Sequence, residues 1–347
     1  MANEFITAIC EIEKEKNISR DILFDAIDAA LVSAYKRNYN TSQSNVLVNI
    51  DRETGDVKVY IQKEVVEEVT DTLSQISLEE ASKISGTYTL GDIVNIEDTP
   101  GAFGRIAAQT AKQVVTQRIK EAERTMVYDE FSAKEHKIVV GTVQRIEKKS
   151  IYLDIGKTEA HLGPNEQVAT ESYPFHKRMK VYVTEVRKTT KGTIVNVSRT
   201  RPAFVGKLFE EEIPEIKEGI VEIKSISREA GSRTKIAVNS HDENVDAVGA
   251  CIGPRGQRVS TIVEILCGEK IDIVRYNEDP EQYISAALAP AEVLSVIVDE
   301  SGAKSCRVIV PDSQLSLAIG NKGQNVRLAA KLTGWKIDIK PLSQAND

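Results

Sequence analysis

Two short glycine turns are the residues of this sequence whose type and spacing most clearly indicate a chemistry. Gly253-Pro254-Arg255-Gly256 and Gly320-Asn321-Lys322-Gly323 each enclose a basic residue between two glycines. Because glycine has no Cβ, such a turn lets a polymer backbone approach closely, and the first amides of a following helix favour a negatively charged group. The turns therefore predict two sites for a phosphate-bearing ligand.

The two turns belong to a longer internal repeat. Cys251–Val259 matches Ala318–Val326 at an offset of 67 residues, and Lys270-Ile271-Asp272-Ile273 returns as Lys336-Ile337-Asp338-Ile339 at an offset of 66. A single glycine turn is more often only a tight connection between helices. The recurrence of the turn with its basic residue, the following Gln and the downstream strand favours a binding function.

Each copy of the repeat has the same predicted order of elements. In the first copy, the pattern of apolar residues predicts a helix at Thr200–Glu212 and then two strands, at Gly219–Ile226 and Thr234–Val238. In the second copy, it predicts a helix at Glu281–Leu288 and then two strands, at Val293–Val298 and Arg307–Val310. A short helix, the glycine turn, a second helix and a final strand follow. The sequence thus predicts two tandem α+β modules, at residues 202–277 and 278–347.

Polar residues follow directly after both turns. If the ligand is a nucleic acid, we expect Gln324 and Asn325 to contact the edges of its bases, because side-chain amides can both donate and accept hydrogen bonds. The candidate ligand-binding residues of the two modules are Gly253, Pro254, Arg255, Gly256, Gln257 and Arg258, and Gly320, Asn321, Lys322, Gly323, Gln324 and Asn325.

The block that precedes the repeat is the basic part of an otherwise acidic chain. The whole sequence has a net charge of −7, whereas residues 136–201 hold 13 basic residues against 6 acidic ones. Such a surplus is typical of a surface that meets phosphate, although a well-solvated small domain can also show it. Apolar residues alternate here with a period of two, so residues 134–201 predict a small antiparallel β-barrel.

Small barrels of this kind bind ligands through their middle strands and adjoining loops. Phe175-His176-Lys177-Arg178 combines a ring that can stack on a base with cations that can contact phosphate. The candidate binding residues of the barrel are Arg145, Lys148, Lys149, Tyr152, His161, Phe175, His176, Lys177, Arg178, Lys180 and Arg199.

The first 133 residues are acidic and form a separate predicted domain. Apolar residues at helical spacing predict two helices, with Ser19 placed to cap the second. Val46–Ile50 and Val57–Ile61 predict a hairpin, and Asp92–Glu97 predicts a further strand. From Phe103 to about Ser132 we expect one long helix, which is long enough to connect two bodies.

These features together resemble known families. The repeated modules are similar to KH domains of the prokaryotic type (type II), and residues 134–201 resemble an S1 domain, an OB-fold barrel, through Leu153-Asp154-Ile155-Gly156 and Val195–Arg199. An α/β head with a long linker helix, an S1-type barrel and two KH modules follow one another as in the NusA family of bacterial transcription elongation factors, in its form without C-terminal acidic repeats. The expected fold class is multidomain α+β.

The resemblance implies a function in transcription. It implies that the head binds core RNA polymerase near the RNA exit channel, and that the S1-KH-KH array holds nascent single-stranded RNA. We therefore expect modulation of pausing, termination and antitermination, together with other termination or antitermination factors. The alternative is an RNA-binding assembly or turnover factor that acts without RNA polymerase, and only the head distinguishes the two.

Enzymatic and membrane functions lack their sequence signals. The sequence has no phosphate-binding P-loop, no dinucleotide-binding glycine motif, no His-Glu-x-x-His and no Gly-x-Ser-x-Gly, so we expect no catalysis, no cofactor and no metal. It also has no long apolar stretch and no signal-peptide pattern. The isolated Cys10, Cys251, Cys267 and Cys306 suggest buried thiols in a cytoplasmic protein, which we expect to be monomeric.

Overall fold

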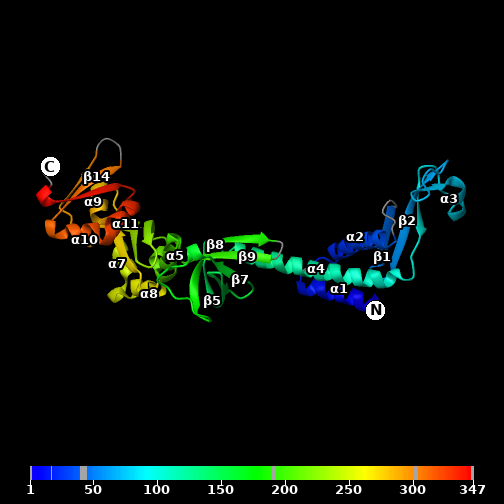
Figure 1. Ribbon diagram of the computed structural model, residues 1–347, viewed down its shortest axis with the longest axis horizontal. Coiled ribbons are helices and arrows are strands. Elements are labelled where there is room, and N and C mark those ends of the chain that lie inside the picture. Colours follow the sequence, from blue (N-terminus) through cyan, green and yellow to red (C-terminus); the bar gives the residue numbers. More distant parts are fainter. Residues whose placement is uncertain (1, 17, 40–44, 190–191, 300–303, 345–347) are drawn as a thin grey trace. The chain divides into compact units, whose positions relative to one another are not determined.

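The computed structural model describes residues 2–16, 18–39, 45–189, 192–299 and 304–344 (Figure 1). The chain divides into two compact units, Met1–Met126 and Val127–Asp347. The division falls inside a long helix, because Val127, Tyr128 and Phe131 at its end pack in the core of the barrel that follows. Among the described residues, no helix has the length and apolar character needed to cross a membrane.

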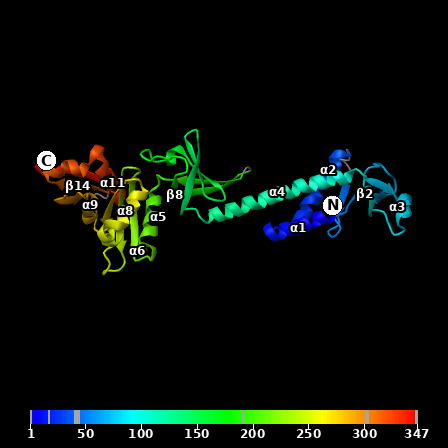
Figure 2. The same cartoon turned by 90° about the horizontal axis from the view of Figure 1, so that it is seen from below.

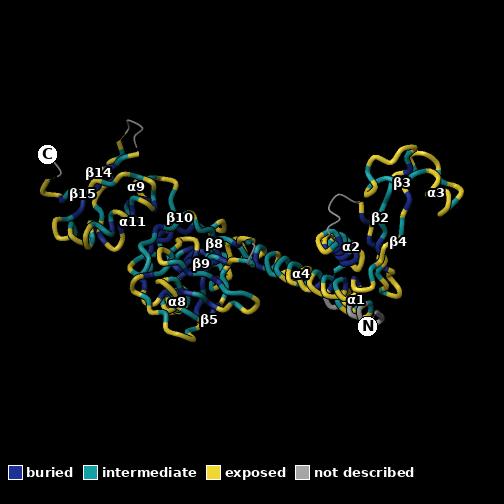
Figure 3. Tube along the Cα trace, turned by 45° about the vertical axis from the view of Figure 1, so that its right-hand side comes forward, coloured by how far each residue is buried: buried dark blue, intermediate teal, exposed yellow. Residues whose placement is uncertain are grey.

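The first unit packs three helices against a hairpin. Its elements are α1 (Ala2–Lys16), α2 (Arg20–Asn38), β1 (Asn45–Ile50), β2 (Val57–Val66), β3 (Gln75–Ser77), α3 (Leu78–Ile84), β4 (Ile93–Glu97) and α4 (Phe103–Ser132). Leu23, Ile27 and Leu31 are fully buried at helical spacing on α2, in one apolar cluster with Phe103. Figure 3 shows buried segments of α2 in dark blue. The predicted helices, hairpin and strand are confirmed; Ser19 lies at the N-cap of α2, but its side chain makes no capping hydrogen bond.

A small lobe extends from the far end of β2 in this unit. β3 pairs parallel and β4 antiparallel with β2, and Val65, Ile76, Ala81 and Val94 form its own core. The sequence did not predict β3 and α3, because elements of three and seven residues are too short to show a period.

The second unit begins with a closed β-barrel. Its strands are β5 (Ile138–Glu147), β6 (Ser150–Asp154), β7 (Glu159–Leu162), β8 (Arg178–Thr189) and β9 (Gly192–Ser198). They close in the order β5-β6-β7-β9-β8, with β7 and β9 parallel and the other pairs antiparallel. This is an OB-fold barrel. It confirms the predicted barrel of the basic block, except that one of its strand pairs is parallel.

The two repeated modules follow, each as α-β-β-α-α-β. The first comprises α5 (Pro202–Glu212), α6 (Pro214–Lys217), β10 (Val221–Glu229), β11 (Arg233–Ser240), α7 (Ala247–Ile252), α8 (Gln257–Ile265) and β12 (Lys270–Arg275). The second comprises α9 (Pro280–Ala287), β13 (Ser295–Val298), β14 (Ser305–Val310), α10 (Leu315–Ile319), α11 (Gln324–Thr333) and β15 (Lys336–Pro341). In each module the first two strands are antiparallel and the last is parallel to its neighbour. Figures 1 and 2 both show α9 and α11 beside β14.

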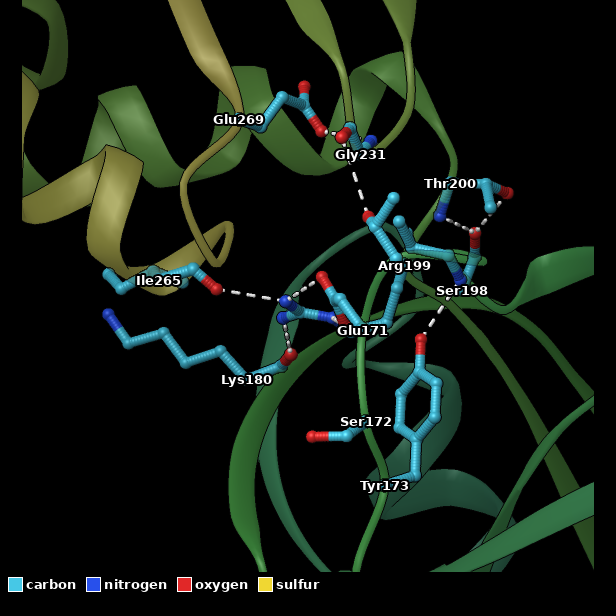
Figure 4. A network of polar contacts seen from close by, with 12 residues as sticks. Glu171, Ser172, Tyr173, Lys180, Ser198, Arg199, Thr200, Gly231, Ile265 and Glu269 are labelled. Atoms are coloured by element: carbon cyan, nitrogen blue, oxygen red, sulfur yellow. Dashed lines mark hydrogen bonds and ion pairs between the residues drawn. The ribbon is translucent and has the colours of Figure 1, made fainter.

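A buried arginine joins the barrel to the first module (Figure 4). Arg199 is 1% exposed and donates hydrogen bonds to the Glu171 carboxylate, at 2.7 Å from Nε, and to the Lys180 carbonyl at 2.7 Å. Its Nη2 also donates to the carbonyl of Ile265, at the end of α8, at 2.9 Å. A buried charge is tolerated only when it is paired and hydrogen-bonded, so this contact fixes the barrel at the end of α8.

Removal of the Glu171 charge should therefore destabilise the second unit. In Glu171→Gln the guanidinium of Arg199 stays buried without its counter-charge, and we expect the free energy of unfolding to fall by about 3 to 5 kcal/mol. Glu147→Gln is the matched control, because Glu147 forms an exposed ion pair with Arg145 on the same barrel and should cost less than about 1 kcal/mol. Urea denaturation followed by circular dichroism compares the two, and equal costs would contradict the assignment.

The cysteines only partly follow the expectation. Cys251 and Cys306 are buried, and burial raises the pKa of their thiols to about 12 and about 11. Cys267 is exposed and lies, with a left-handed φ of 56°, in the turn that follows α8, and Cys10 is partly exposed. The prediction of a buried thiol is wrong for Cys267.

This difference predicts selective thiol labelling. The thiolate is the reactive form, so at pH 8 we expect an aromatic disulfide reagent to label Cys267 quickly and Cys251 and Cys306 only after unfolding. Mass spectrometry of the labelled peptides measures each site. Labelling of Cys251 in the folded chain as fast as that of Cys267 would contradict the structure.

Candidate nucleic-acid interface

The two glycine loops have the same backbone conformation. The first and last glycines of 253–256 and 320–323 have φ between 72° and 76°, and the enclosed Arg255 and Lys322 have φ of 54° and 51°. A left-handed conformation costs an L residue about 1 to 2 kcal/mol, and such strain often marks a binding or catalytic site. Both basic side chains are exposed.

The first glycine of each loop is required by close packing as well as by its φ. A Cβ on Gly253 would lie 2.6 Å from Cγ of Arg258, and a Cβ on Gly320 would lie 2.7 Å from the backbone nitrogen of Asn325. Arg258 and Asn325 occupy equivalent positions of the repeat, and each packs against the first glycine of its turn. The Arg258 guanidinium donates to the Ala250 carbonyl of α7 at 2.7 Å. In the same way, the Asn325 amide donates to the Ala318 carbonyl of α10.

The last glycine of the first loop faces open space, and that of the second loop faces the side chain of Arg327. A Cβ on Gly256 would meet nothing within 4 Å, and one on Gly323 would come only within 3.3 Å of the flexible Arg327 guanidinium. Helices α8 and α11 begin directly after these glycines, and neither has a side-chain cap on its first amides. Each loop therefore offers an accessible glycine, a helix N-terminus and a cation, which together suit a phosphate group.

Three of the four polar residues after the turns have structural roles that rule out the expected contact or restrict it. Asn325 is buried, and its amide donates to the carbonyls of Leu288 at 2.9 Å and Ala318 at 3.1 Å. The prediction that Asn325 reads a base edge is therefore wrong. The Gln324 amide donates to Glu229 in the first module at 2.7 Å, while Gln257 remains exposed.

Arg258 is held in a similar way. Its guanidinium lies 2.8 Å from the Glu215 carboxylate. Partial burial opposes ionisation of Glu215, but its own backbone amide and Arg258 outweigh that effect and lower the pKa of this carboxyl. Arg258 therefore supports the loop, while Pro254 and Arg255 form its exposed part.

The sequence reasoning missed Arg327 as part of the second loop. Its guanidinium donates to the Lys322 carbonyl and contacts Glu229 at 3.0 Å. A comparison of the two copies of the repeat could have indicated it. Arg327 stands at the position where the first copy has the uncharged Ser260, so the second loop has one more cation. The second loop thus has an additional cation beside Gly323.

Three of the predicted barrel residues form one row across neighbouring strands. Arg145 of β5 lies over the ring of Tyr152 of β6, 3.8 Å from its centroid, and the Tyr152 and His161 rings are 5.3 Å apart. His161 lies 3.3 Å from the side-chain oxygen of Asn196, a residue of β9 that the sequence reasoning did not single out. Hydrogen bonds to Glu159 and Glu147 raise the pKa of Arg145 and hold its guanidinium in place. One face of Tyr152 is therefore covered.

The remaining predicted barrel residues lie elsewhere. Lys148 and Lys149 form the exposed β5–β6 turn, both with positive φ. Phe175, His176 and Arg178 are exposed around the start of β8, where Lys177 donates to the Ser172 carbonyl and Lys180 pairs with Glu211. Lys177, Arg178 and Lys180 line a hollow of about 370 Å³ beside α8.

Arg199 is a correction to the predicted binding residues. It is buried and its donors are used by Glu171 and by the carbonyls of Lys180 and Ile265. A side chain in that position holds two domains together and does not contact a ligand.

An OB-fold barrel followed by two α-β-β-α-α-β modules, each with a glycine loop, defines a multidomain protein of the tandem-KH class. Comparison with protein families matches the head and the two modules: residues 4–125 match the NusA N-terminal domain, residues 199–276 the NusA-like first KH domain and residues 280–347 the NusA-like second KH domain.

Whole-chain comparisons extend the match. The chain is 56% identical to a Bacillus subtilis protein over 100% of this chain and 93% of that one, and 55% identical to a Halalkalibacterium halodurans protein over 100% and 90%. A Thermus thermophilus protein is 40% identical over 98% of this chain and 90% of its own length. All three are named transcription termination/antitermination protein NusA. The chain belongs to the NusA family.

The geometry of the first loop predicts unequal effects of its two glycines. Gly253→Ala must adopt a left-handed φ and also displace Arg258, whereas Gly256→Ala has only the cost of its φ, about 1 kcal/mol. We expect Gly253→Ala to lower the free energy of unfolding by at least about 1 kcal/mol more than Gly256→Ala. Chemical denaturation of the two variants measures the difference, and equal losses would show that Arg258 does not crowd the turn.

Proposed function

We propose that this chain is a transcription termination and antitermination factor that binds both core RNA polymerase and nascent single-stranded RNA. The observation that carries the RNA part is the pair of glycine loops with matching left-handed backbones and exposed Arg255 and Lys322. KH domains use such a loop to clamp the backbone of about four nucleotides. Two loops in tandem therefore fit an extended single strand.

Each loop would act on the RNA backbone by the same physical means. The open space over Gly256 admits a phosphate, and at Gly323 the Arg327 guanidinium lies beside the same position. The amides at the start of α8 and α11 would face the phosphate, and Arg255 or Lys322 would add a positive charge. In the barrel, the exposed Phe175 offers a ring for stacking next to Arg178. Base identity would be read by Gln257 of the first module, which is exposed. In the second module Gln324 is paired with Glu229 and Asn325 is buried.

The polymerase part of the proposal rests on the head, residues 1–133, which we infer binds near the RNA exit channel. Its small lobe exposes Ile84, Leu90 and Ile93. We assign the polymerase contact to this lobe on the basis of these exposed apolar side chains. A factor that holds the transcript and the polymerase together needs to shift a pause equilibrium by only about 1 to 3 kcal/mol to change it 5- to 150-fold.

The alternative is an RNA-binding assembly or turnover factor that acts without polymerase. Family membership favours transcription, since the curated relatives are named for termination and antitermination. RNA binding is common to both possibilities, so the two differ only in the partner of the head.

Charge reversal in the loops tests the RNA part. We expect Arg255→Asp with Lys322→Asp to weaken binding of a single-stranded RNA at least about ten-fold, and to flatten the dependence of log K on log salt by about 1.4, because two phosphate contacts are lost. Lys83→Asp with Arg105→Asp makes the same charge change at exposed sites of the head and should leave affinity unchanged. Unchanged affinity in the loop variant, with an intact thermal transition, would mean that the turns are only structural.

Removal of the head tests the polymerase part. The truncated chain should begin at residue 127, because Phe131 belongs to the barrel core. We expect residues 127–347 to keep the RNA affinity of the full chain and to lose binding to purified core RNA polymerase in sedimentation. Equal polymerase binding by both chains would support the alternative.

A further inference from the structure

Arg327, beside the second glycine loop, is held by two different parts of the chain. Its Nη1 donates to the carbonyl of Lys322 inside the loop, and its Nε and Nη2 donate to one carboxylate oxygen of Glu229 in the first module, at 3.3 Å and 3.0 Å. The same Nη1 lies 3.3 Å from the position that a Cβ on Gly323 would take. The guanidinium is thereby placed at the edge of the position where a phosphate would bind.

Two N–H groups of this guanidinium are available to a ligand. An arginine side chain has five N–H donors. Within the described part of the chain, Lys322 and Glu229 are its acceptors, and they take one donor on each of Nε, Nη1 and Nη2. One donor on each terminal nitrogen is left, and the Arg327 side chain is 49% exposed. Such a pair of N–H groups matches the oxygens of a phosphate.

Glu229 lies at the end of β10, next to a turn that is itself fixed. The amide of Gly231 in this turn donates to the buried Glu269 carboxylate at 2.7 Å (Figure 4). A Cβ on Gly231 would lie 2.5 Å from the side chain of Val168 in the barrel. The carboxylate that contacts Arg327 is therefore attached to a turn that the barrel and the first module hold in place.

Glu229 is charged at neutral pH. The hydrogen bond from Gln324, at 2.7 Å, together with Arg327 outweighs the effect of partial burial and lowers the pKa of this carboxyl. An arginine that is held in place before the ligand arrives loses less side-chain freedom on binding. The first loop has the uncharged Ser260 at the position of Arg327, so this arrangement distinguishes the second loop.

We propose that Arg327 binds an RNA phosphate at the second loop together with Lys322, and that Glu229 of the first module is the positioning residue that holds Arg327 there. The inference deepens the RNA part of the proposed function and rests on it. The second loop then reaches its full affinity only when the first module supplies Glu229.

The probe is a fluorescein-labelled single-stranded RNA of about 12 nucleotides, which can span two loops that each hold about four. We expect Arg327→Gln in the full chain to weaken binding at least about five-fold. It should also flatten the dependence of log K on log salt by about 0.7, the contribution of one phosphate contact. Arg307→Gln is the matched control, because it removes the same charge at an exposed position of β14 in the same module, and it should change neither quantity.

The direction of the effect of Glu229→Ala tests the positioning role. Removal of a carboxylate near a phosphate would by itself strengthen RNA binding, whereas loss of the positioned Arg327 weakens it. We expect Glu229→Ala to weaken binding about three-fold in the parent chain, and not to weaken it in the Arg327→Gln background, because the two residues act as a pair. Ser232→Ala removes a neighbouring contact between the modules, with Gln324 at 2.8 Å, and should leave affinity unchanged.

The outcomes separate this inference from the proposed function. An unchanged affinity and salt slope in Arg327→Gln, while Arg255→Asp with Lys322→Asp weakens binding, would overturn the inference alone. Unchanged or stronger binding by Glu229→Ala, or an equal loss in both backgrounds, would show that Glu229 does not position Arg327. Failure of the parent chain to bind the strand would contradict both. The thermal transition of each variant, expected to match that of the parent, separates loss of binding from loss of folding.

Discussion

The left-handed backbone of the two glycine loops is the constraint on which the binding surface depends. Each loop reverses the chain within four residues, so that one helix ends and the next begins with its amides exposed. Two different side chains, Arg258 and Asn325, meet this constraint at the same position of the repeat, by donating to carbonyls of the preceding helix. A bulky residue could not replace Gly253 or Gly320 without moving them.

Buried charges then connect the domains of the second unit. Arg199 reaches from the barrel to the carbonyl of Ile265, and Lys235 reaches from the first KH module to the carbonyl of Ala289. Burial lowers the pKa of Lys235, and the Asp272 carboxylate opposes that shift. Each cation also has a carboxylate partner, Glu171 for Arg199 and Asp272 for Lys235. The loss of either partner of a pair would leave an uncompensated buried charge. The loops and the barrel are thereby fixed on one connected body.

Much of this architecture could be predicted from the sequence, and the failures have a common cause. Glycine spacing, the repeat and the change of period identified the loops, the modules and the barrel, because those signals are local. The inward orientation of Asn325 and Arg199 was not predictable, because their partners Leu288 and Ile265 lie 37 and 66 residues away. Polar residues next to a binding motif look alike in sequence whether they face a ligand or hold the motif together. Cys267 shows the reverse case, an apolar residue type exposed by a turn.

The central claim is that the loops hold a transcript while the head holds the polymerase, and the dwell time of core RNA polymerase at a hairpin-dependent pause tests it most directly. The account predicts that the full chain lengthens the dwell, and that both the loop double variant and residues 127–347 fail to do so although each remains folded. An unchanged dwell with the full chain, or an equal effect of the chain without its head, would contradict it.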